Sequence, residues 1–368
     1  MSRILVVHSP YVQSFPSGEN VFVNKQIQAL EAQGIEVIKL SARQSTVRGF
    51  LSLLKYIWDI NRELRFLLNR EYDAVVLHNL VPLLVPFRAL LRQSNILRFV
   101  HNYRSLCVAG SFFRDGKDCT LCISRTLSAI KNKCYQDSFI KSILAKLHQQ
   151  TELRLIQSSQ VKVIFLSKES QNLIKNQLEI RKAFLLPNFS SFHRPFLPQA
   201  DRNGRWLFVG RISEEKGIRA LLEVWPENHF LDVIGDGPLL PELQELFRNK
   251  GNIQFKGMIE SRNLANIMRC YAGAIFPSLW SEISSLVLRE FVSTGLPIIM
   301  LGHPNRESLF RDFRTSVELD FLSTNGIETA INQIEENYEQ FLANLKKLNT
   351  EKLSLDLWIS QFNAILSE

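Results

Sequence analysis

The stretch FPSLWSEISSLVLREFVSTGLPIIM, residues 276–300, indicates how the second half of the chain folds. It opens as the end of a buried strand, breaks at Pro277-Ser278 and enters an amphipathic helix that ends near Gly295-Leu296-Pro297. A further apolar run follows directly. This order predicts a strand–helix–strand unit with parallel strands.

Two carboxylates lie in this stretch, Glu282 before the helix and Glu290 inside it. Eight helical residues rise about 12 Å, so the two acids would suit an elongated ligand held at both ends. The helix N-terminus near Ser284 and Ser285 offers N–H groups and a positive dipole end for a phosphate between them. A nucleotide diphosphate sugar has this form. The alternative is an ordinary helix with two solvated acids.

Apolar strand-like runs alternate with helical spacing through the first half of the chain, which predicts a parallel sheet covered on both faces. The expected strands are Arg3–His8, Ile35–Leu40, Asp73–His78, Leu97–His101, Val161–Ser167 and Ala183–Pro187. Helices are expected over 19–33, 47–69, 80–93, 138–158 and 168–178.

The same alternation restarts after a Pro- and Phe-rich segment. The expected strands there are Trp206–Gly210, Phe230–Gly235, Ile253–Gly257, Ala272–Phe276 and Pro297–Leu301, and 324–368 is expected to be helical. We therefore predict an α/β protein with two Rossmann-like, doubly wound domains that face each other across a ligand-binding cleft. The expected boundaries are 1–188 (with the C-terminal helix 352–368 as an additional part), a linker at 189–204, and 205–351.

Composition indicates a soluble globular chain, with 368 residues of which 45% are hydrophobic and 22% charged. We expect neither a membrane span nor an export signal, which favours the cytoplasm. Residues 1–188 hold 26 Lys/Arg and 13 Asp/Glu, a net charge of +13, whereas 189–368 carry −5. An anionic partner for the first half is expected. A lipid-diphosphate substrate or the inner face of the plasma membrane fits better than nucleic acid, because no nucleic-acid motif is present.

The segment FVGRISEEKG, residues 208–217, places Arg211 and Lys216 on one strand-to-helix turn. Both side chains could reach one diphosphate, the arginine as a bidentate fork and the lysine as a point charge. A surface turn paired with its own glutamates is the alternative. Gly235 and Gly237 follow the next expected strand and permit close approach of the backbone to a ligand, although a tight turn would also explain them.

Four cysteines, Cys107, Cys119, Cys122 and Cys134, lie in a polar loop with the spacing C-x11-C-x2-C-x11-C. They could form a structural zinc site, which we place first, ahead of free thiols and then disulfides. A second open question is the basic amphipathic segment 47–70. It could lie on anionic lipid, but packing on its own sheet is the preferred interpretation.

Taken together, these motifs resemble the retaining family-4 glycosyltransferases (glycosyl transferases group 1) of the GT-B fold, of the type found in bacterial surface-polysaccharide synthesis. The shared features are E-x7-E at 282–290, G-R-x-x-x-x-K-G at 210–217, G-x-G-P at 235–238, Leu186-Pro187-Asn188 and His101. The cysteine loop has a similar counterpart in some bacterial members. Departures are Ser17 in place of a glycine, Asn102 in place of aspartate, and 302–313, which lacks the usual glycine pair.

The resemblance implies transfer of a sugar from a UDP- or GDP-sugar to an acceptor hydroxyl, with retained anomeric configuration and no catalytic metal. It assigns sugar hydroxyls to Glu282, ribose to Glu290 and the donor sugar to His101. The acceptor could be lipid-linked, in lipopolysaccharide, capsule or exopolysaccharide assembly. The remaining donor contacts would come from Gly18, Gly210, Arg211, Lys216, Gly235, Gly237, Met258, Ser284, Ser285, Leu286 and Val287.

Four other functions differ from glycosyl transfer in what they require. An epimerase would convert the nucleotide sugar without an acceptor, and a non-catalytic subunit would bind it without turnover. A glycoside hydrolase is disfavoured because its two carboxyl groups must lie about 5–9.5 Å apart across one bond. The absence of G-x-G-x-x-G counts against a dehydrogenase.

Overall fold

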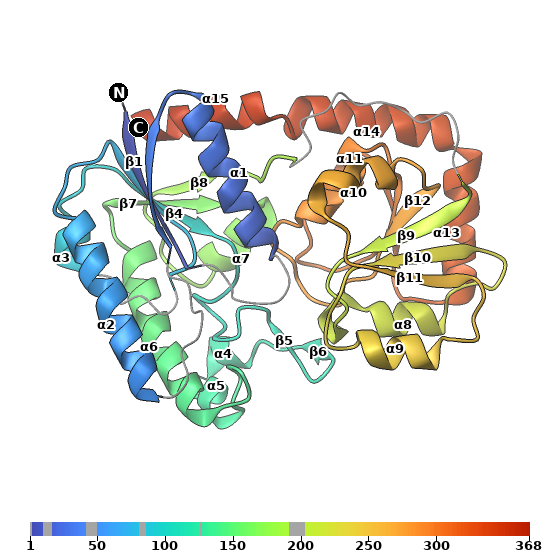
Figure 1. Ribbon diagram of the computed structural model, residues 1–368, viewed down its shortest axis with the longest axis horizontal. Helices are drawn as coiled ribbons and strands as arrows, with labels where there is room; N and C mark the ends of the chain where they lie inside the picture. The colour runs from blue at the N-terminus through green and yellow to red at the C-terminus, as the bar shows by residue number, and fades with distance from the viewer. Residues whose placement is uncertain (1, 10–16, 42–49, 81–85, 126, 191–202) are drawn as a thin grey trace. The chain divides into compact units, whose positions relative to one another are not determined.

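Two parallel six-stranded sheets form the framework of the structure, a computed structural model that describes residues 2–9, 17–41, 50–80, 86–125, 127–190 and 203–368 (Figure 1). Each sheet belongs to one unit of the chain. Unit 1 comprises Met1–Arg114, Cys119–Asn188 and Trp358–Glu368. Unit 2 comprises Asp115–Asp118 and Phe189–Leu357.

The sheet of unit 1 has the strand order β2-β1-β3-β4-β7-β8, with every pair parallel. Its strands read as continuous apolar runs because both faces are covered, as in β1, where Ile4–Val7 are buried. The strands are β1 (Arg3–His8), β2 (Glu36–Ser41), β3 (Ala74–Leu77), β4 (Ile96–Val100), β7 (Val161–Phe165) and β8 (Ala183–Leu185).

Serine caps begin three of the longer helices around this sheet. The hydroxyls of Ser17, Ser138 and Ser167 each accept a hydrogen bond from a backbone N–H in the first turn, which satisfies a donor that the helix leaves unpaired. The helices are α1 (Gly18–Ala32), α2 (Phe50–Leu67), α3 (Phe87–Leu90), α6 (Phe139–Ile156) and α7 (Lys168–Lys175).

The C-terminal helix α15 (Leu355–Ser367) returns to unit 1 from residue 358 onward. Trp358 packs against Phe22 of α1, with 6.1 Å between ring centroids. Near the end of the helix, the carbonyl oxygen of Ile365 accepts a hydrogen bond of 2.7 Å from Lys162 Nζ on β7. Unit 1 is therefore completed by the last residues of the chain.

The sheet of unit 2 has the order β11-β10-β9-β12-β13-β14, again all parallel. Its strands are β9 (Arg205–Val209), β10 (Phe230–Ile234), β11 (Ile253–Gly257), β12 (Gly273–Phe276), β13 (Ile298–Leu301) and β14 (Ser316–Leu319). Its helices are the 3-10 turn Glu214–Lys216, α8 (Ile218–Glu223), α9 (Leu240–Leu246), α10 (Ser261–Met268), α11 (Leu286–Ser293), α12 (Leu309–Asp312), α13 (Thr324–Glu336) and α14 (Tyr338–Lys352).

The expected fold class is confirmed, because both halves of the chain form doubly wound parallel sheets. Strand β14 was not predicted, since its four residues SVEL carry a glutamate and no long apolar run. The helix expected over 80–93 is present only as α3, and 81–85 lie outside the described residues. The same holds for 191–202 of the expected linker.

The polar loop with the cysteines has more structure than the sequence indicated. It forms the two-stranded hairpin β5 (Phe113–Arg114) and β6 (Lys117–Asp118), followed by the short helices α4 (Leu121–Ser124) and α5 (Ser128–Lys131). Within the described ranges, none of the helices combines the length and the apolar composition that crossing a bilayer requires.

Close packing of β12 against β9 depends on a glycine. A Cβ at Gly273 would lie 2.5 Å from the ring of the fully buried Trp206. We expect Gly273→Ala to lower the free energy of unfolding by about 1–3 kcal/mol, as overpacked cores do. Urea unfolding would measure this. Gly251→Ala is the matched control, because a Cβ there meets nothing within 4 Å. Equal stability of the two variants would contradict the packing argument.

Candidate functional site

Two loops of unit 2 meet at the carboxyl edge of its sheet, one after β9 and one after β12, which are neighbouring strands. Leu279 N donates to the carbonyl oxygen of Glu215 at 2.9 Å. Gly217 adopts a left-handed conformation (φ 69°), and a Cβ there would lie 2.0 Å from the carbonyl oxygen of Pro277. The two loops are therefore in direct backbone contact, which only glycine at position 217 allows.

An ion pair joins side chains from these two loops. Lys216 Nζ lies 2.7 Å from Glu282 Oε1, and both side chains are largely buried, with 21% and 10% exposed. The same oxygen accepts hydrogen bonds from Ser278 Oγ at 2.7 Å and Trp280 Nε1 at 3.2 Å. Lys216 Nζ also lies over the Trp280 ring, 5.3 Å from its centroid. Glu282 is thus held by three donors in one orientation.

The carboxyl of Glu282 is kept ionised. Burial alone would raise its pKa, but Lys216, the Ser278 hydroxyl and Arg306 together outweigh burial and lower the pKa below its usual range. A carboxylate held in this way can accept hydrogen bonds from sugar hydroxyls, and it cannot act as a proton donor near neutral pH.

Arg306 is a residue that sequence reasoning missed. It follows β13, is 5% exposed, and donates through Nη2 to the carbonyl oxygen of Ser278. Burial lowers its pKa, against the opposing charges of Glu282 and Glu318. Its Nε and Nη1 have no hydrogen-bond partner within the described part of the chain. Buried guanidinium donors without partners are costly, so Arg306 is a candidate for contact with an anionic or hydroxyl-rich ligand.

Two of the predicted glycines, Gly235 and Gly237, pack closely against a neighbouring backbone. A Cβ at Gly235 (φ 142°) would lie 1.9 Å from the carbonyl oxygen of Gly210, and one at Gly237 would lie 2.3 Å from that of Ile212. Close contact of the loops after β9 and β10 therefore explains these glycines. Met258, which follows β11, is 49% exposed and thus accessible to a ligand.

Helix α11 starts later than expected for an elongated ligand held between Glu282 and Glu290. Its N-cap is Ser285, so Leu286 and Val287 form its first turn, and Ser284 still belongs to the loop. Only about half of the segment between Glu282 and Glu290 is helical, so the rise expected from eight helical residues does not apply. Glu290 is buried at 8% exposure.

A buried ion pair fixes the helix in place. Arg289 is fully buried and pairs with both carboxylate oxygens of Glu307, at 2.7 and 3.0 Å. Glu307 lies in 302–313, the segment that lacks the glycine pair of the resembling family. This segment thus contributes charged residues where glycines were expected.

Arg211, predicted to bind the diphosphate, is exposed just after the end of β9.

In unit 1, His101 follows β4 and forms a ring-to-ring hydrogen bond. Its Nε2 lies 2.8 Å from Nδ1 of His78, at the end of the neighbouring strand β3. His8, at the end of β1, meets His78 edge to face, with 6.0 Å between ring centroids. The three histidines come from adjacent strands, which explains why the sequence did not connect His101 with His78.

These histidines are neutral in the folded protein. Burial is the main cause: it lowers the pKa of His8 to about 4, while the hydrogen bond that His8 Nε2 donates to Asn20 Oδ1 opposes the shift. The pKa values of His78 and His101 are also depressed by burial, with nearby positive groups such as Arg98 acting in the same direction. A neutral His101 can hydrogen-bond to a sugar hydroxyl, but it carries no charge for a diphosphate.

Gly18 is the first residue of α1, directly after the cap Ser17. The hydroxyl of Ser17 accepts from Asn20 N at 3.2 Å, so the serine found in place of the family's glycine has a structural role. Residues 10–16 of this loop lie outside the described residues.

Two of the four cysteines are in contact. The hydrogen bond between the thiols of Cys107 and Cys122 lowers the pKa of Cys107 to about 6 and raises that of Cys122. However, in the residues that the structure describes, no three or more His, Cys, Asp or Glu side chains are grouped so that they could hold a metal ion. Structural zinc at Cys107, Cys119, Cys122 and Cys134 therefore stays a prediction.

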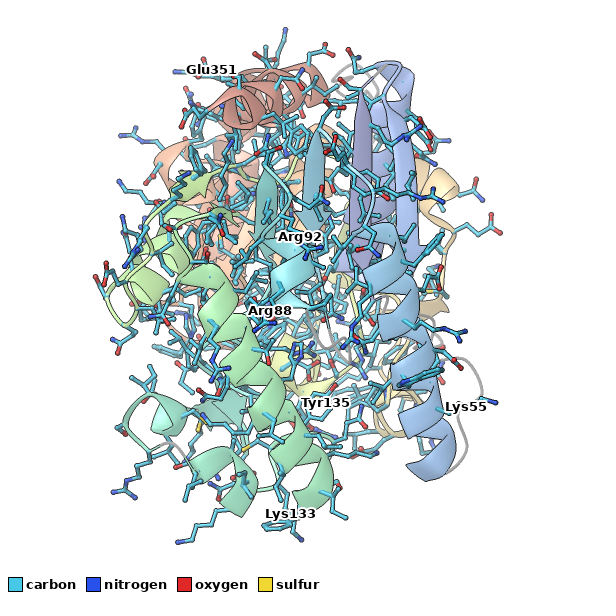
Figure 2. The ribbon with its side chains drawn as sticks, turned by 90° about the vertical axis from the view of Figure 1, so that its left-hand side faces the viewer. Lys55, Arg88, Arg92, Lys133, Tyr135 and Glu351 are labelled. Carbon is cyan, nitrogen blue, oxygen red and sulfur yellow. The ribbon has the colours of Figure 1, made fainter. Side chains whose placement is uncertain are left out.

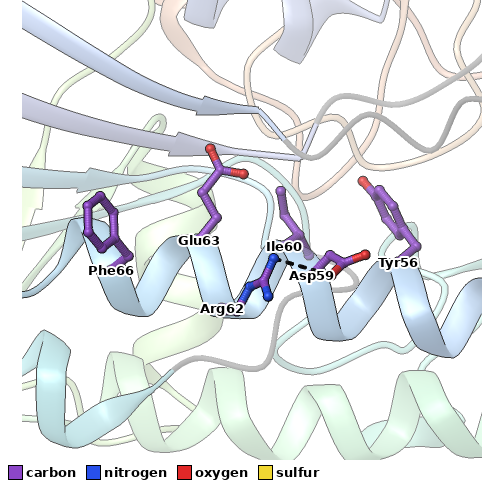
Figure 3. A pocket seen from close by; sticks show the side chains of 6 residues that line it. All are labelled: Tyr56, Asp59, Ile60, Arg62, Glu63 and Phe66. Atoms are coloured by element: carbon purple, nitrogen blue, oxygen red, sulfur yellow. Dashed lines mark ion pairs between the residues drawn. The ribbon is translucent and has the colours of Figure 1, made fainter.

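A surface hollow of about 590 Å³ lies along α2 and is separate from all predicted site residues (Figure 3). Its only ion pair within the lining joins Arg62 and Asp59 at 3.8 Å. Leu64 and Leu68, on the apolar face of segment 47–70, are buried, so this part of the face packs within unit 1. The hollow is lined by Tyr56, Asp59, Ile60, Arg62, Glu63 and Phe66.

Comparisons with known proteins point to one family. Residues 189–351 match the family model "Glycosyl transferases group 1". No curated protein sequence matches the chain at a significant level.

Solved structures with the same fold cover nearly the whole chain. Sucrose-phosphate synthase from Thermosynechococcus elongatus has a TM-score of 0.71 at 14% identity, covering 100% of this chain and 98% of that one. HepE from Anabaena, in complex with UDP and glucose, has a TM-score of 0.67 at 14% identity, covering 100% of both chains. WaaG, a glycosyltransferase involved in lipopolysaccharide biosynthesis, has a TM-score of 0.63 at 14% identity, covering 98% of both. At this identity the likeness shows the fold, two Rossmann-like domains of the GT-B type.

The histidine cluster predicts acid sensitivity. Below pH 6.5 the unfolded chain binds protons at these histidines that the folded unit does not, so stability falls as the pH is lowered toward about 4, the pKa of folded His8. Each histidine contributes about 1.4 kcal/mol per pH unit. His8→Gln should make the decline shallower by about that amount in urea unfolding at a series of pH values. An unchanged slope would mean that His8 is protonated in the folded protein.

Proposed function

We propose that this glycosyltransferase, whose residues 189–351 form a domain of the glycosyl transferases group 1 family, transfers a sugar from a nucleotide diphosphate sugar to an acceptor hydroxyl with retention of anomeric configuration. The observation that carries the proposal is the contact of Lys216 with Glu282 where the loops after β9 and β12 meet. A cation for phosphate and a carboxylate for sugar hydroxyls then stand side by side.

Lys216 can serve both groups at once. An ammonium has three N–H donors, and only one is needed for Glu282, so the others remain for oxygens of the diphosphate. Arg211 lies five residues earlier on the same turn and is exposed, which leaves its planar fork accessible. Both cations would neutralise the charge that develops on the leaving group.

In the proposed reaction, the bond between the anomeric carbon and the diphosphate oxygen breaks with its electron pair leaving on the phosphate. The acceptor oxygen forms its bond to the same carbon on the same face, and its proton passes to the departing phosphate oxygen. The protein contributes mainly charge stabilisation, which is worth most in a partly buried site. Two cations and the N-terminus of α11 supply it, so the proposal needs no catalytic metal.

The other contacts follow the resemblance. Glu290 would hold the ribose, the backbone at Met258 would meet the base, and residues 284–287 would meet the diphosphate. In unit 1, His101 would hydrogen-bond the donor sugar as a neutral imidazole, with its ring orientation set by His78. Gly18 would allow the start of α1 to approach the diphosphate.

We assign the reaction to assembly of a bacterial surface polysaccharide, namely lipopolysaccharide, capsule or exopolysaccharide, with a lipid-linked acceptor and a UDP- or GDP-sugar donor. Support comes from the basic first half of the chain and the cysteine-containing resemblance. Among the structures with this fold, HepE was solved with UDP-glucose and WaaG belongs to lipopolysaccharide biosynthesis. This assignment places the protein at the inner face of the plasma membrane.

The two cations should matter for turnover more than their neighbours. We expect Arg211→Ala and Lys216→Ala each to lower kcat by about two orders of magnitude, judging by the loss of single charge-stabilising donors elsewhere. Arg219→Ala is the matched control, since Arg219 lies on α8 and pairs with Glu214 and Glu242 instead. Near-normal kcat in Arg211→Ala would refute the assignment of that residue.

The donor and the stereochemistry can be tested directly. A thermal-shift screen against UDP-, GDP- and ADP-sugars should raise Tm for the true donor only, because a ligand of the native state stabilises it. NMR of the product formed with that donor should then show the donor's anomeric configuration. An inverted product would overturn retention. Conversion of donor without acceptor would indicate an epimerase, and donor binding without turnover over a broad acceptor panel would indicate a binding subunit.

A further inference from the structure

Helix α6 of unit 1 buries polar side chains and exposes large apolar ones. Its buried residues include the polar Ser142, Gln149 and Glu152, whereas its first turns expose large apolar side chains. Ile140, Leu144 and Leu147 are 62%, 41% and 61% exposed. A helix that covers a sheet normally shows the opposite distribution.

Each of the three inward polar residues makes a hydrogen bond or ion pair that holds the helix in this orientation. Ser142 Oγ accepts from Tyr135 N at 3.0 Å, and Gln149 Nε2 donates to the carbonyl oxygen of Arg104 at 2.8 Å. Glu152 forms a buried ion pair of 2.7 Å with Arg98 of β4. Rotating the helix to bury its exposed apolar residues would break these bonds. The apolar face therefore stays exposed in unit 1.

The exposed side chains form one surface. Ile140, Leu144 and Leu147 follow the i, i+4, i+7 spacing of a single helix face, and Phe139, 54% exposed, lies beside them. Leu127, 69% exposed, directly precedes α5, which packs against α6. We call Leu127, Phe139, Ile140, Leu144 and Leu147 the α6 patch.

Basic residues surround this patch. Residues 119–150 contain five Lys/Arg and one Asp/Glu, and Lys131, Lys133 and Lys141 are exposed. Figure 2 looks onto the side of unit 1 with α6, α3 and α2, where Lys133 lies near the start of α6. The same view labels Arg88 and Arg92 on α3 and Lys55 on α2, all three exposed.

We propose that the α6 patch docks unit 1 on the surface of an anionic membrane, with its apolar side chains in the headgroup boundary and the lysines around it on lipid phosphates. An interfacial helix combines an apolar face with flanking lysines in this way. A second copy of the chain fits less well, because a two-fold contact would set the same lysines against themselves. In the segment 47–70, the membrane candidate of the sequence analysis, Leu64 and Leu68 of the apolar face are buried and do not reach a membrane surface.

The docking can be tested independently of the proposed reaction, because binding to vesicles is measured without any donor or acceptor. The full chain is sedimented with vesicles of phosphatidylglycerol and phosphatidylcholine in equal parts, and with vesicles of phosphatidylcholine alone. We expect binding to the anionic vesicles that weakens as salt is added, and little binding to the neutral ones.

Variants locate the surface. Ile140→Gln with Leu147→Gln should reduce the partition coefficient at least about tenfold, because two buried apolar side chains are lost. The matched control is Leu246→Gln with Phe321→Gln, two exposed apolar residues of unit 2 (58% and 70%), which should bind as the parent does. Lys133→Gln with Lys141→Gln should weaken binding about 25-fold, at about fivefold per lysine. Lys346→Gln with Lys347→Gln on α14 is the control for charge.

Three outcomes would overturn the proposal. The first is that the parent protein does not bind anionic vesicles. The second is that Ile140→Gln with Leu147→Gln binds as the parent does. The third is a concentration-dependent dimer that this double variant abolishes, which would make the α6 patch a contact between copies. Because all the changed side chains are exposed, unchanged Tm values verify that each variant is folded.

Discussion

The backbone contact between Gly217 and Pro277 is the constraint on which the proposed site depends. Any side chain at position 217 would collide with the carbonyl oxygen of Pro277, so the loops after β9 and β12 are in direct backbone contact. This approach brings Lys216 within hydrogen-bond distance of Glu282, although the two residues are 66 positions apart in the sequence. Ser278 and Trp280 reach the same carboxylate from the second loop. One glycine therefore sets the geometry of a charge network.

Local patterns were enough to predict the strands of both sheets except β14, because continuous apolar runs bounded by glycine or proline have few alternatives. The same patterns drew attention to Lys216 and Glu282, each in the segment that follows a predicted strand. Local patterns could not predict which residues of different strands and loops are in contact. His78 meets His101 only because β3 and β4 are neighbours, and Arg306 reaches Ser278 only through the order β12-β13. Such contacts are set by sheet topology and leave no trace in local spacing.

Where the sequence departed from the resembling family, the structure gives the departures physical roles. Ser17 caps α1, and the segment without a glycine pair contributes Arg306 and the partner of Arg289. The position of α11 could not be read to the residue, because the loop before it is polar and the helix starts only at Leu286. The inverted polarity of α6 was also invisible in the sequence, because the spacing of Ile140, Leu144 and Leu147 does not show which face of the helix is covered.

The return of α15 to unit 1 has a consequence for biosynthesis. The N-terminal sheet emerges from the ribosome first, yet Trp358 and the carbonyl oxygen of Ile365 belong to its finished packing. The packing of unit 1 is therefore incomplete until unit 2 has been translated and α15 has left the exit tunnel. During that interval Phe22 lacks its contact with Trp358, and the incomplete unit exposes apolar surface that chaperones can bind.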